Sequence, residues 1–297
     1  MSKEPSIDDV LFPVRLEDIT LAYGDGRPLQ GFKAVVDCET GRVFSVVTRN
    51  YRLVTNAKAL EFGMNCFSRL FRMVDPGDMK PYKIHMPKTR SFCHVDFLYR
   101  DGESTMFSKQ DVWYPFIRIT NCYNRIHSPS VRIGFVRAVC ENGLVIRSEQ
   151  ARFSICKYMD RDGSISVLHP KRIEELEGKF VATLYRLTEI PVPREYMWEL
   201  AKKVFGMKEP RTENEYARQC YKEKRERIEE LAGKYFPEMG ENGYAALNVL
   251  TDFATRPRGY ASRAVVLHSL QSRVSGWMDS FLEYIGYRSF NEYIGAN

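Results

Sequence analysis

The feature that most constrains the fold is a change of hydrophobic period near residue 170. Before His169-Pro170 the chain consists of short β-type runs separated by turn residues, and after it the apolar residues recur at helical spacing. The turn dipeptides Asp101-Gly102, Asn142-Gly143 and Asp162-Gly163 favour antiparallel hairpins. We therefore predict an α+β fold, a mainly antiparallel sheet with one inserted helix followed by a helical C-terminal region.

The expected strands are rich in β-branched and aromatic residues, and they cover residues 32–37, 42–48, 83–86, 92–99, 113–120, 131–139, 144–148, 151–157 and 164–168. The first two form a hairpin whose turn contains Gly41, a residue that can adopt a positive φ. The inserted helix has Asn56 as its cap, one apolar face from Ala57 to Phe71, and an end at residues 75–78.

Helical spacing in the second half predicts helices over residues 173–190, 196–205 and 266–285. A further long helix follows Thr212, which forms a capping box with Glu215. Its run from Lys222 to Glu230 alternates in charge and predicts a solvated face. These patterns favour a β-rich domain over residues 1–170 and a helical region over 171–297. Whether the helices form a separate domain or pack on the core of the sheet stays open.

Bulk composition indicates a folded protein of 297 residues, with 44% hydrophobic and 13% aromatic residues. No run of about 18 apolar residues is present, so we expect no membrane span. The seven cysteines form no CxxC pair, and the N-terminus is polar. We therefore expect reduced thiols and a cytoplasmic location.

Positive charge is concentrated in the middle of the chain. Residues 118–157 contain seven arginines and lysines but only two glutamates, in a chain of net charge +6. Arginine pairs bidentately with phosphate, and nearby tyrosines can stack on unpaired bases. We predict nucleic-acid contacts by Arg118, Asn121, Tyr123, Arg125, Arg132, Arg137 and Arg147. A half-solvated sheet with scattered charge, or internal salt bridges, would produce the same pattern.

Strand alternation places Phe116, Arg118 and Thr120 on one face and the intervening Ile117 and Ile119 on the other. In the next strand, the face that carries Arg137 also carries Val131, Ile133 and Phe135, while Arg132 lies on the opposite face.

His94 and Asp96 share a strand face, which makes them candidate catalytic residues for a metal-dependent nuclease or phosphodiesterase. No third ligand lies nearby in the sequence, and no phosphate-binding glycine loop or zinc motif is present. The sequence therefore favours a protein without enzymatic activity and without a cofactor or metal. Mg²⁺ or Mn²⁺ would be needed only by the nuclease alternative.

Three segments resemble the phage/plasmid-like proteins of domain of unknown function family 932. The likeness spans roughly residues 30–260 and is carried by Tyr51, Val54, Asn56, Arg137, Val139, Cys140, Asn142, Gly143, Asn248 and Thr251. The family tends to have a small residue followed by Asp-Gly where this chain has Tyr123-Asn124-Arg125. The resemblance implies a mobile genetic element, and hence work on DNA such as recombination, annealing or evasion of host defence.

Together these observations predict a non-enzymatic protein that holds the DNA backbone, with single strands as one candidate form, through an arginine-rich sheet. A homo-oligomer and a protein partner bound by the C-terminal helices are further expectations. The alternatives are the metal-dependent nuclease and a protein-binding inhibitor or adaptor.

Overall fold

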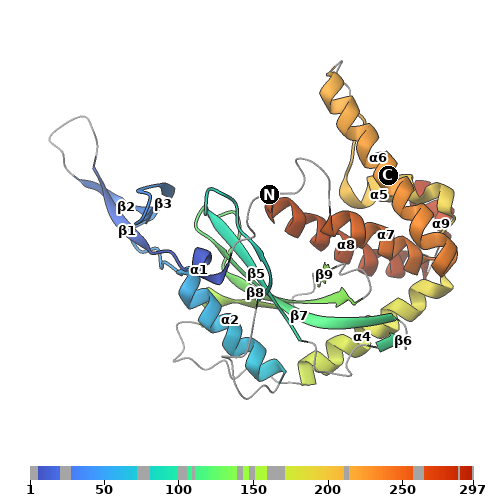
Figure 1. Cartoon of the computed structure of the whole chain (residues 1–297), viewed down its shortest axis with the longest axis horizontal. Helices are drawn as coiled ribbons and strands as arrows, with labels where there is room; N and C mark the ends of the chain where they lie inside the picture. The colour runs from blue at the N-terminus through green and yellow to red at the C-terminus, as the bar shows by residue number, and fades with distance from the viewer. Residues whose placement is uncertain are drawn as a thin grey trace. The chain divides into compact units, whose positions relative to one another are not determined.

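The computed structural model describes residues 6–20, 28–71, 81–99, 106–108, 111–138, 143–146, 151–158, 171–210, 214–256, 264–286 and 288–295. They form antiparallel sheets and a helical C-terminal region, which confirms the predicted α+β class (Figure 1). Two compact units divide the chain. Unit 1 comprises Met1–Leu98, Phe116–Ile133 and Arg152–Ile173, and unit 2 comprises Tyr99–Pro115, Gly134–Ala151 and Glu174–Asn297. The chain thus passes repeatedly between the units, a different division from a single boundary near residue 170.

Unit 1 begins with a short helix and a three-stranded antiparallel sheet of order β1-β2-β3. Its elements are α1 (Ile7–Val10), β1 (Val14–Thr20), β2 (Pro28–Asp37) and β3 (Val43–Thr48). The predicted hairpin is confirmed as β2–β3, and Gly41 in its turn has a φ of +69°. Strand β1 was not predicted, because its charged residues leave no clear apolar run.

Helix α2 (Asn56–Leu70) follows this sheet, and its cap is Thr55 rather than Asn56. The Thr55 hydroxyl accepts a hydrogen bond from the Lys58 N–H at 3.3 Å. The Asn56 side chain is buried instead and donates to the Val10 carbonyl at 2.9 Å. The predicted helix end at residues 75–78 lies outside the described residues.

A second sheet has the strand order β10-β8-β7-β5-β4, with β6 pairing with β7 and β9 pairing with β8. Its strands are β4 (Pro81–His85), β5 (Phe92–Leu98), β6 (Met106–Ser108), β7 (Asp111–Cys122), β8 (Ser130–Arg137), β9 (Gly143–Val145) and β10 (Arg152–Ser154). The strand expected over residues 151–157 is shorter, because the chain turns into helix α3 (Ile155–Tyr158). The strand expected over 164–168 lies outside the described residues.

In unit 1, helix α2 packs against β5 of this sheet, and buried apolar side chains of both elements form a core between them. Figure 1 labels the two elements. Gly63 of α2 lies so close to Ile119 of β7 that a Cβ atom at Gly63 would overlap the isoleucine side chain. Phe67 packs on Phe97 of β5 at a ring distance of 6.5 Å. Side chains alternate along a strand, so the residues between these core positions point to the opposite face.

Unit 2 contains most of the helices: α4 (Lys171–Glu189), the 3₁₀ turn η3 (Arg194–Tyr196), α5 (Met197–Phe205), α6 (Glu215–Met239), α7 (Gly243–Thr255), α8 (Ala264–Ile285) and α9 (Phe290–Gly295). Helix α7 packs against α6 and α8 (Figure 1). Thr212, the predicted start of the capping box, lies outside the described residues. Helix α6 is capped by Asn214, whose side chain accepts from the Ala217 N–H at 3.2 Å. None of the helices in the described part of the chain is long and apolar enough to cross a membrane.

Candidate functional site

The sheet face opposite α2 in unit 1 carries a row of charged and polar side chains. Lys83 of β4 lies opposite Asp96 of β5, which lies opposite Arg118 of β7. One step along, His85, His94 and Thr120 are aligned in the same way. On β8, Val131 and Ile133 belong to the apolar core, so Arg132 between them shares the polar side, together with its β10 partner Arg152. We define the polar face as Lys83, His85, His94, Asp96, Arg118, Thr120, Arg132 and Arg152.

The centre of the polar face is a buried ion pair. Arg118 Nε donates to Asp96 Oδ1 and its Nη2 donates to Oδ2, both at 2.7 Å. Each residue is only 2% exposed. This bidentate pair satisfies both carboxylate oxygens and neutralises the guanidinium charge inside the protein. The structure therefore contradicts the prediction that Arg118 contacts phosphate: its side chain is an internal structural partner of Asp96.

Two histidines lie beside this pair. His94 is fully buried, and its Nδ1 lies 2.9 Å from the Thr120 hydroxyl oxygen. Burial lowers the pKa of His85 to about 4, with Arg118 and Lys83 lowering it further and Asp96 opposing the shift. At neutral pH the His85 ring is therefore uncharged.

The same geometry removes the support for a metal site at His94 and Asp96. Both oxygens of Asp96 are already bound by Arg118, which leaves the carboxylate poorly placed to coordinate a cation. Among the residues that the structure describes, no group of three or more His, Cys, Asp or Glu side chains could hold a metal ion. His94 and Asp96 thus make buried polar contacts with neighbouring strand residues inside the sheet.

The outer end of the polar face carries two arginines on adjacent strands. Arg132 of β8 is directly opposite Arg152 of β10, and both are half-buried. The pKa of nearby His127 is lowered, first by burial and then by the positive charges of Arg132 and Arg152. Guanidinium groups on directly opposed residues of neighbouring strands can bind a shared anion.

Arg137 is not part of this face, and the prediction that it contacts phosphate is also contradicted. In unit 2 it donates from Nε and Nη2 to the two carboxylate oxygens of Asp111, at 2.6 and 2.8 Å, and it is only 4% exposed. The Tyr244 hydroxyl donates to the same carboxylate at 2.6 Å and accepts from the Trp113 indole at 3.1 Å. This network fastens α7 to strands β7 and β8 within unit 2.

Asn121 and Tyr123 are buried as well, so neither presents its side chain to a nucleic acid. The Asn121 amide donates to the Val54 carbonyl at 3.0 Å and to the Asn56 side chain at 2.8 Å. Tyr123 is 2% exposed, stacks on Phe44 at 5.3 Å, and accepts the Asn56 N–H at 2.8 Å. Both hold the start of α2 in place.

Of the remaining predicted contacts, Arg125 is exposed and Arg147 lies outside the described residues. Arg125 adopts a φ of +63°, and its guanidinium donates to the Val46 carbonyl at 3.4 Å. The arginine cluster of the sequence is thus divided among internal pairs, a turn and the Arg132–Arg152 pair.

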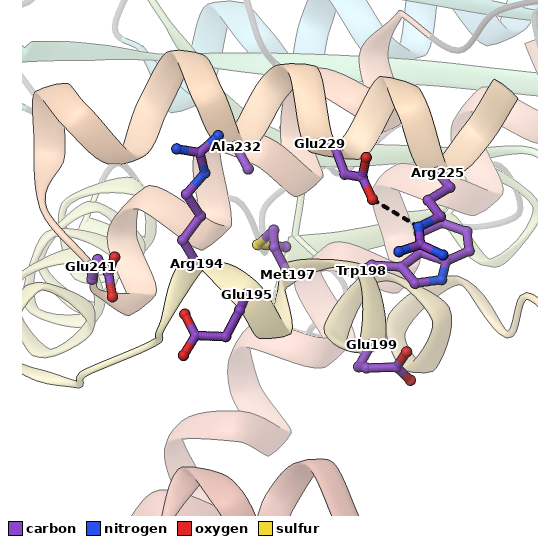
Figure 2. A pocket seen from close by; sticks show the side chains of 9 residues that line it. All are labelled: Arg194, Glu195, Met197, Trp198, Glu199, Arg225, Glu229, Ala232 and Glu241. Atoms are coloured by element: carbon purple, nitrogen blue, oxygen red, sulfur yellow. Dashed lines mark hydrogen bonds and ion pairs between the residues drawn. The ribbon is translucent and has the colours of Figure 1, made fainter. Parts of the chain in front are cut away.

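A pocket of about 510 Å³ lies in unit 2 and was not predicted from the sequence. It is formed by η3 and α5 on one side and α6 on the other, with Glu241 at its end (Figure 2). The charge-alternating run of α6 forms ion pairs between residues four apart, including Arg225–Glu229 at 2.7 Å. The lining residues come from three separate stretches of sequence, and no local motif joins them.

Comparison with known proteins adds no identity: no family model, no curated protein and no solved structure matches this chain. The resemblance to family 932 therefore stays a prediction. Several residues that carry it have internal roles. The Asn248 amide donates to the Tyr244 carbonyl at 2.9 Å, and the Thr251 hydroxyl donates to the Leu247 carbonyl at 2.8 Å, both inside the buried helix α7.

Proposed function

We propose that unit 1 binds the sugar–phosphate backbone of DNA, with Arg132 and Arg152 as its main phosphate contacts. The observation that carries this proposal is the cross-strand pairing of these two half-buried arginines on the polar face. A phosphate placed between them would accept hydrogen bonds from both guanidinium groups. Lys83, at the opposite edge of the polar face, and the exposed Arg125 are further basic groups of unit 1.

The chemistry favours backbone contact over the reading of bases. Phe92 and Phe116 lie on the same side of the sheet as the polar face, and both are buried, so neither offers an open ring for base stacking. Arginines that contact phosphate fix position and add affinity without sequence preference. We infer a supporting role in the handling of DNA, such as strand annealing in a mobile element, which is the setting that the family resemblance implies.

The test is fluorescence anisotropy with labelled single-stranded and double-stranded oligonucleotides, at salt concentrations between about 50 and 200 mM. Arg132→Gln/Arg152→Gln should bind more weakly and with a shallower salt dependence than the unmodified protein. The loss of two phosphate contacts reduces the slope of log K against log salt by roughly 1.4 for single strands and 1.8 for duplex DNA.

The matched control is Lys222→Gln/Lys224→Gln, which removes the same charge from the exposed surface of α6. This control should bind DNA nearly as the unmodified protein does. Equal losses in the two double variants would mean that net charge, and not the Arg132–Arg152 pair, determines binding. The absence of binding to either form of DNA at low salt would remove the proposal.

A further inference from the structure

Strand β1 is an edge of the three-stranded sheet in unit 1, since it pairs with β2 alone among the described strands. The Cys38 N–H donates to the Pro13 carbonyl at 3.0 Å, which fixes the direction of the backbone groups in this pair of strands. Because such groups point alternately to the two sides of a strand, those of Arg15 and Glu17 point toward β2. The residues whose N–H and C=O groups point away from β2 are Val14, Leu16 and Asp18.

The outer edge of β1 is open to a further strand. Within the described part of the chain, no backbone group of Val14, Leu16 or Asp18 forms a hydrogen bond on this side. Exposed edge strands are commonly protected from pairing by lysine, proline or a bulge. The segment from Val14 to Asp18 has the sequence VRLED, which contains neither lysine nor proline, and the register of β1 shifts only after Asp18. An extended segment can therefore add to this edge through main-chain hydrogen bonds.

The side chains of β1 are complementary to a second copy of the same strand. Arg15 and Glu17 lie two residues apart and therefore project from the same face of the sheet. Within the chain they already form an ion pair of 2.6 Å at the surface. A two-fold axis through Leu16 of two antiparallel copies places Arg15 of each copy directly opposite Glu17 of the other. Opposite charges in such cross-strand positions stabilise a sheet.

This register suits both the hydrogen bonds and the charges. In an antiparallel pair, two opposed residues direct their backbone groups either both toward the partner strand or both away from it. Moving the axis to Arg15 or to Glu17 meets that condition, but it sets two arginines or two glutamates directly opposite each other, which is destabilising. With the axis at Leu16, Val14 of one copy bonds to Asp18 of the other, and every outward backbone group of the segment gains a partner.

We propose that β1 pairs with β1 of a second copy of this chain, which joins the two three-stranded sheets into one. The Leu16 residues of the two copies exchange backbone hydrogen bonds at the axis, and the Arg15–Glu17 pairs flank them. The occupant is a second copy because the charges of the segment complement themselves in the register that its backbone allows. The interface is small, so we expect a dissociation constant in the micromolar range or weaker. The proposal does not depend on the DNA contacts proposed for unit 1.

Sedimentation velocity of the full chain over a range of concentrations tests the dimer. Arg15→Glu should weaken dimerisation by about 2- to 30-fold, the effect of losing two exposed ion pairs. Arg15→Glu/Glu17→Arg reverses both charges and should restore dimerisation, because opposite charges again face each other. The matched control is Arg49→Glu, which makes the same change of charge at an exposed position beyond the end of β3. This control should dimerise like the unmodified protein.

A cysteine at the two-fold axis provides a second measurement. The Cα atoms of a hydrogen-bonded antiparallel pair are about 5.5 Å apart, within the range that a disulfide spans. Leu16→Cys, in a chain whose exposed Cys38 and Cys156 are replaced by serine, should therefore form a linked dimer on oxidation with diamide. Asp18→Cys in the same background lies opposite Val14 of the other copy and should stay largely monomeric.

Three results would overturn the proposal. The first is a monomer at every concentration up to about 1 mM. The second is equal dimerisation of Arg15→Glu and the unmodified protein, which would place the interface elsewhere on the chain. The third is failure of the double charge reversal to restore what Arg15→Glu loses, because the charges would then not select the register. Dimerisation that is weakened in Arg15→Glu, restored in the double variant and trapped by Leu16→Cys is the result we expect.

Discussion

Breaking the buried Arg118–Asp96 pair should strongly destabilise unit 1. The Asp96 carboxylate is 2% exposed, and in Arg118→Met it loses two charge-assisted hydrogen bonds of 2.7 Å. Removal of one partner from a buried ion pair costs about 3–5 kcal/mol, because the other charge is left without compensation. That is a large part of the 5–15 kcal/mol by which folded proteins are ordinarily stable.

Removing both charges should cost much less than removing one. In Asp96→Val/Arg118→Met no buried charge remains, and such replacements are often neutral or stabilising by about 1–4 kcal/mol. Urea unfolding followed by circular dichroism measures both effects. With a slope of about 1–3 kcal/mol per molar urea, the single variant should shift the midpoint by about 1–5 M. The double variant should unfold close to the unmodified protein.

The same two variants also test whether Arg118 stabilises the fold without contributing to DNA binding. Because Asp96 neutralises Arg118 internally, the double variant should keep the salt dependence of DNA binding. The reasoning is refuted if Arg118→Met unfolds within about 0.5 kcal/mol of the unmodified protein, the range of ordinary surface substitutions. It is also refuted if the double variant is as unstable as the single one, since uncompensated charge would then not be the cause.

Three further predictions concern unit 1. The pKa of His85 is near 4 in the folded protein and about 6.5 in the unfolded chain, so the unfolded state binds more protons between these pH values. The free energy of unfolding should therefore fall by up to about 3 kcal/mol as the pH drops from 6.5 to 4. His85→Gln should flatten that dependence in urea unfolding at pH 4.5 and 7, and an unchanged profile would exclude His85 as its source. Gly63→Ala should destabilise the protein by about 1–3 kcal/mol, because the added methyl group overlaps Ile119, despite the better helix propensity of alanine. Adding Ile119→Ala should relieve the overlap, and additive losses of the two substitutions in thermal unfolding would contradict this. Thr55→Ala should cost about 1 kcal/mol of stability because α2 loses its cap. Asn56→Ala should cost about 1–3 kcal/mol because the buried Val10 carbonyl and Asn121 amide each lose a hydrogen-bond partner. A larger loss for Thr55→Ala than for Asn56→Ala in denaturant titrations would contradict these roles.

Elements with a clear period were predicted well, and those without one were missed. The hairpin β2–β3 and helix α4 have the alternation and helical spacing that short-range patterns reveal. Helix α7 has no polar face, since Gly243–Ala254 are all buried, and a helix buried on all sides gives no amphipathic signal. The caps of α2 and α6 were each misplaced by one or two residues, because neighbouring Thr and Asn residues are chemically equivalent candidates.

The pocket of unit 2 could not have been predicted by any local rule. Trp198, Arg225 and Glu241 meet only because α5 packs against α6 and the chain returns at the end of α6. The alternation of polar and apolar residues along α5 and α6 indicates which side of each helix is exposed. It does not indicate which helices pack against each other.

The sequence by itself determined the α+β class and the local excess of positive charge. It also determined the alternation within each strand, which places Arg118 on the face opposite Ile117 and Arg132 on the face opposite Arg137. Only the tertiary structure decided which of those charges form buried ion pairs inside the protein. Arg118 and Arg137 find carboxylates 22 and 26 residues away in the chain, at Asp96 and Asp111. Alternation is a local property of one strand, whereas the partner of a side chain depends on the register between strands and on what covers the face.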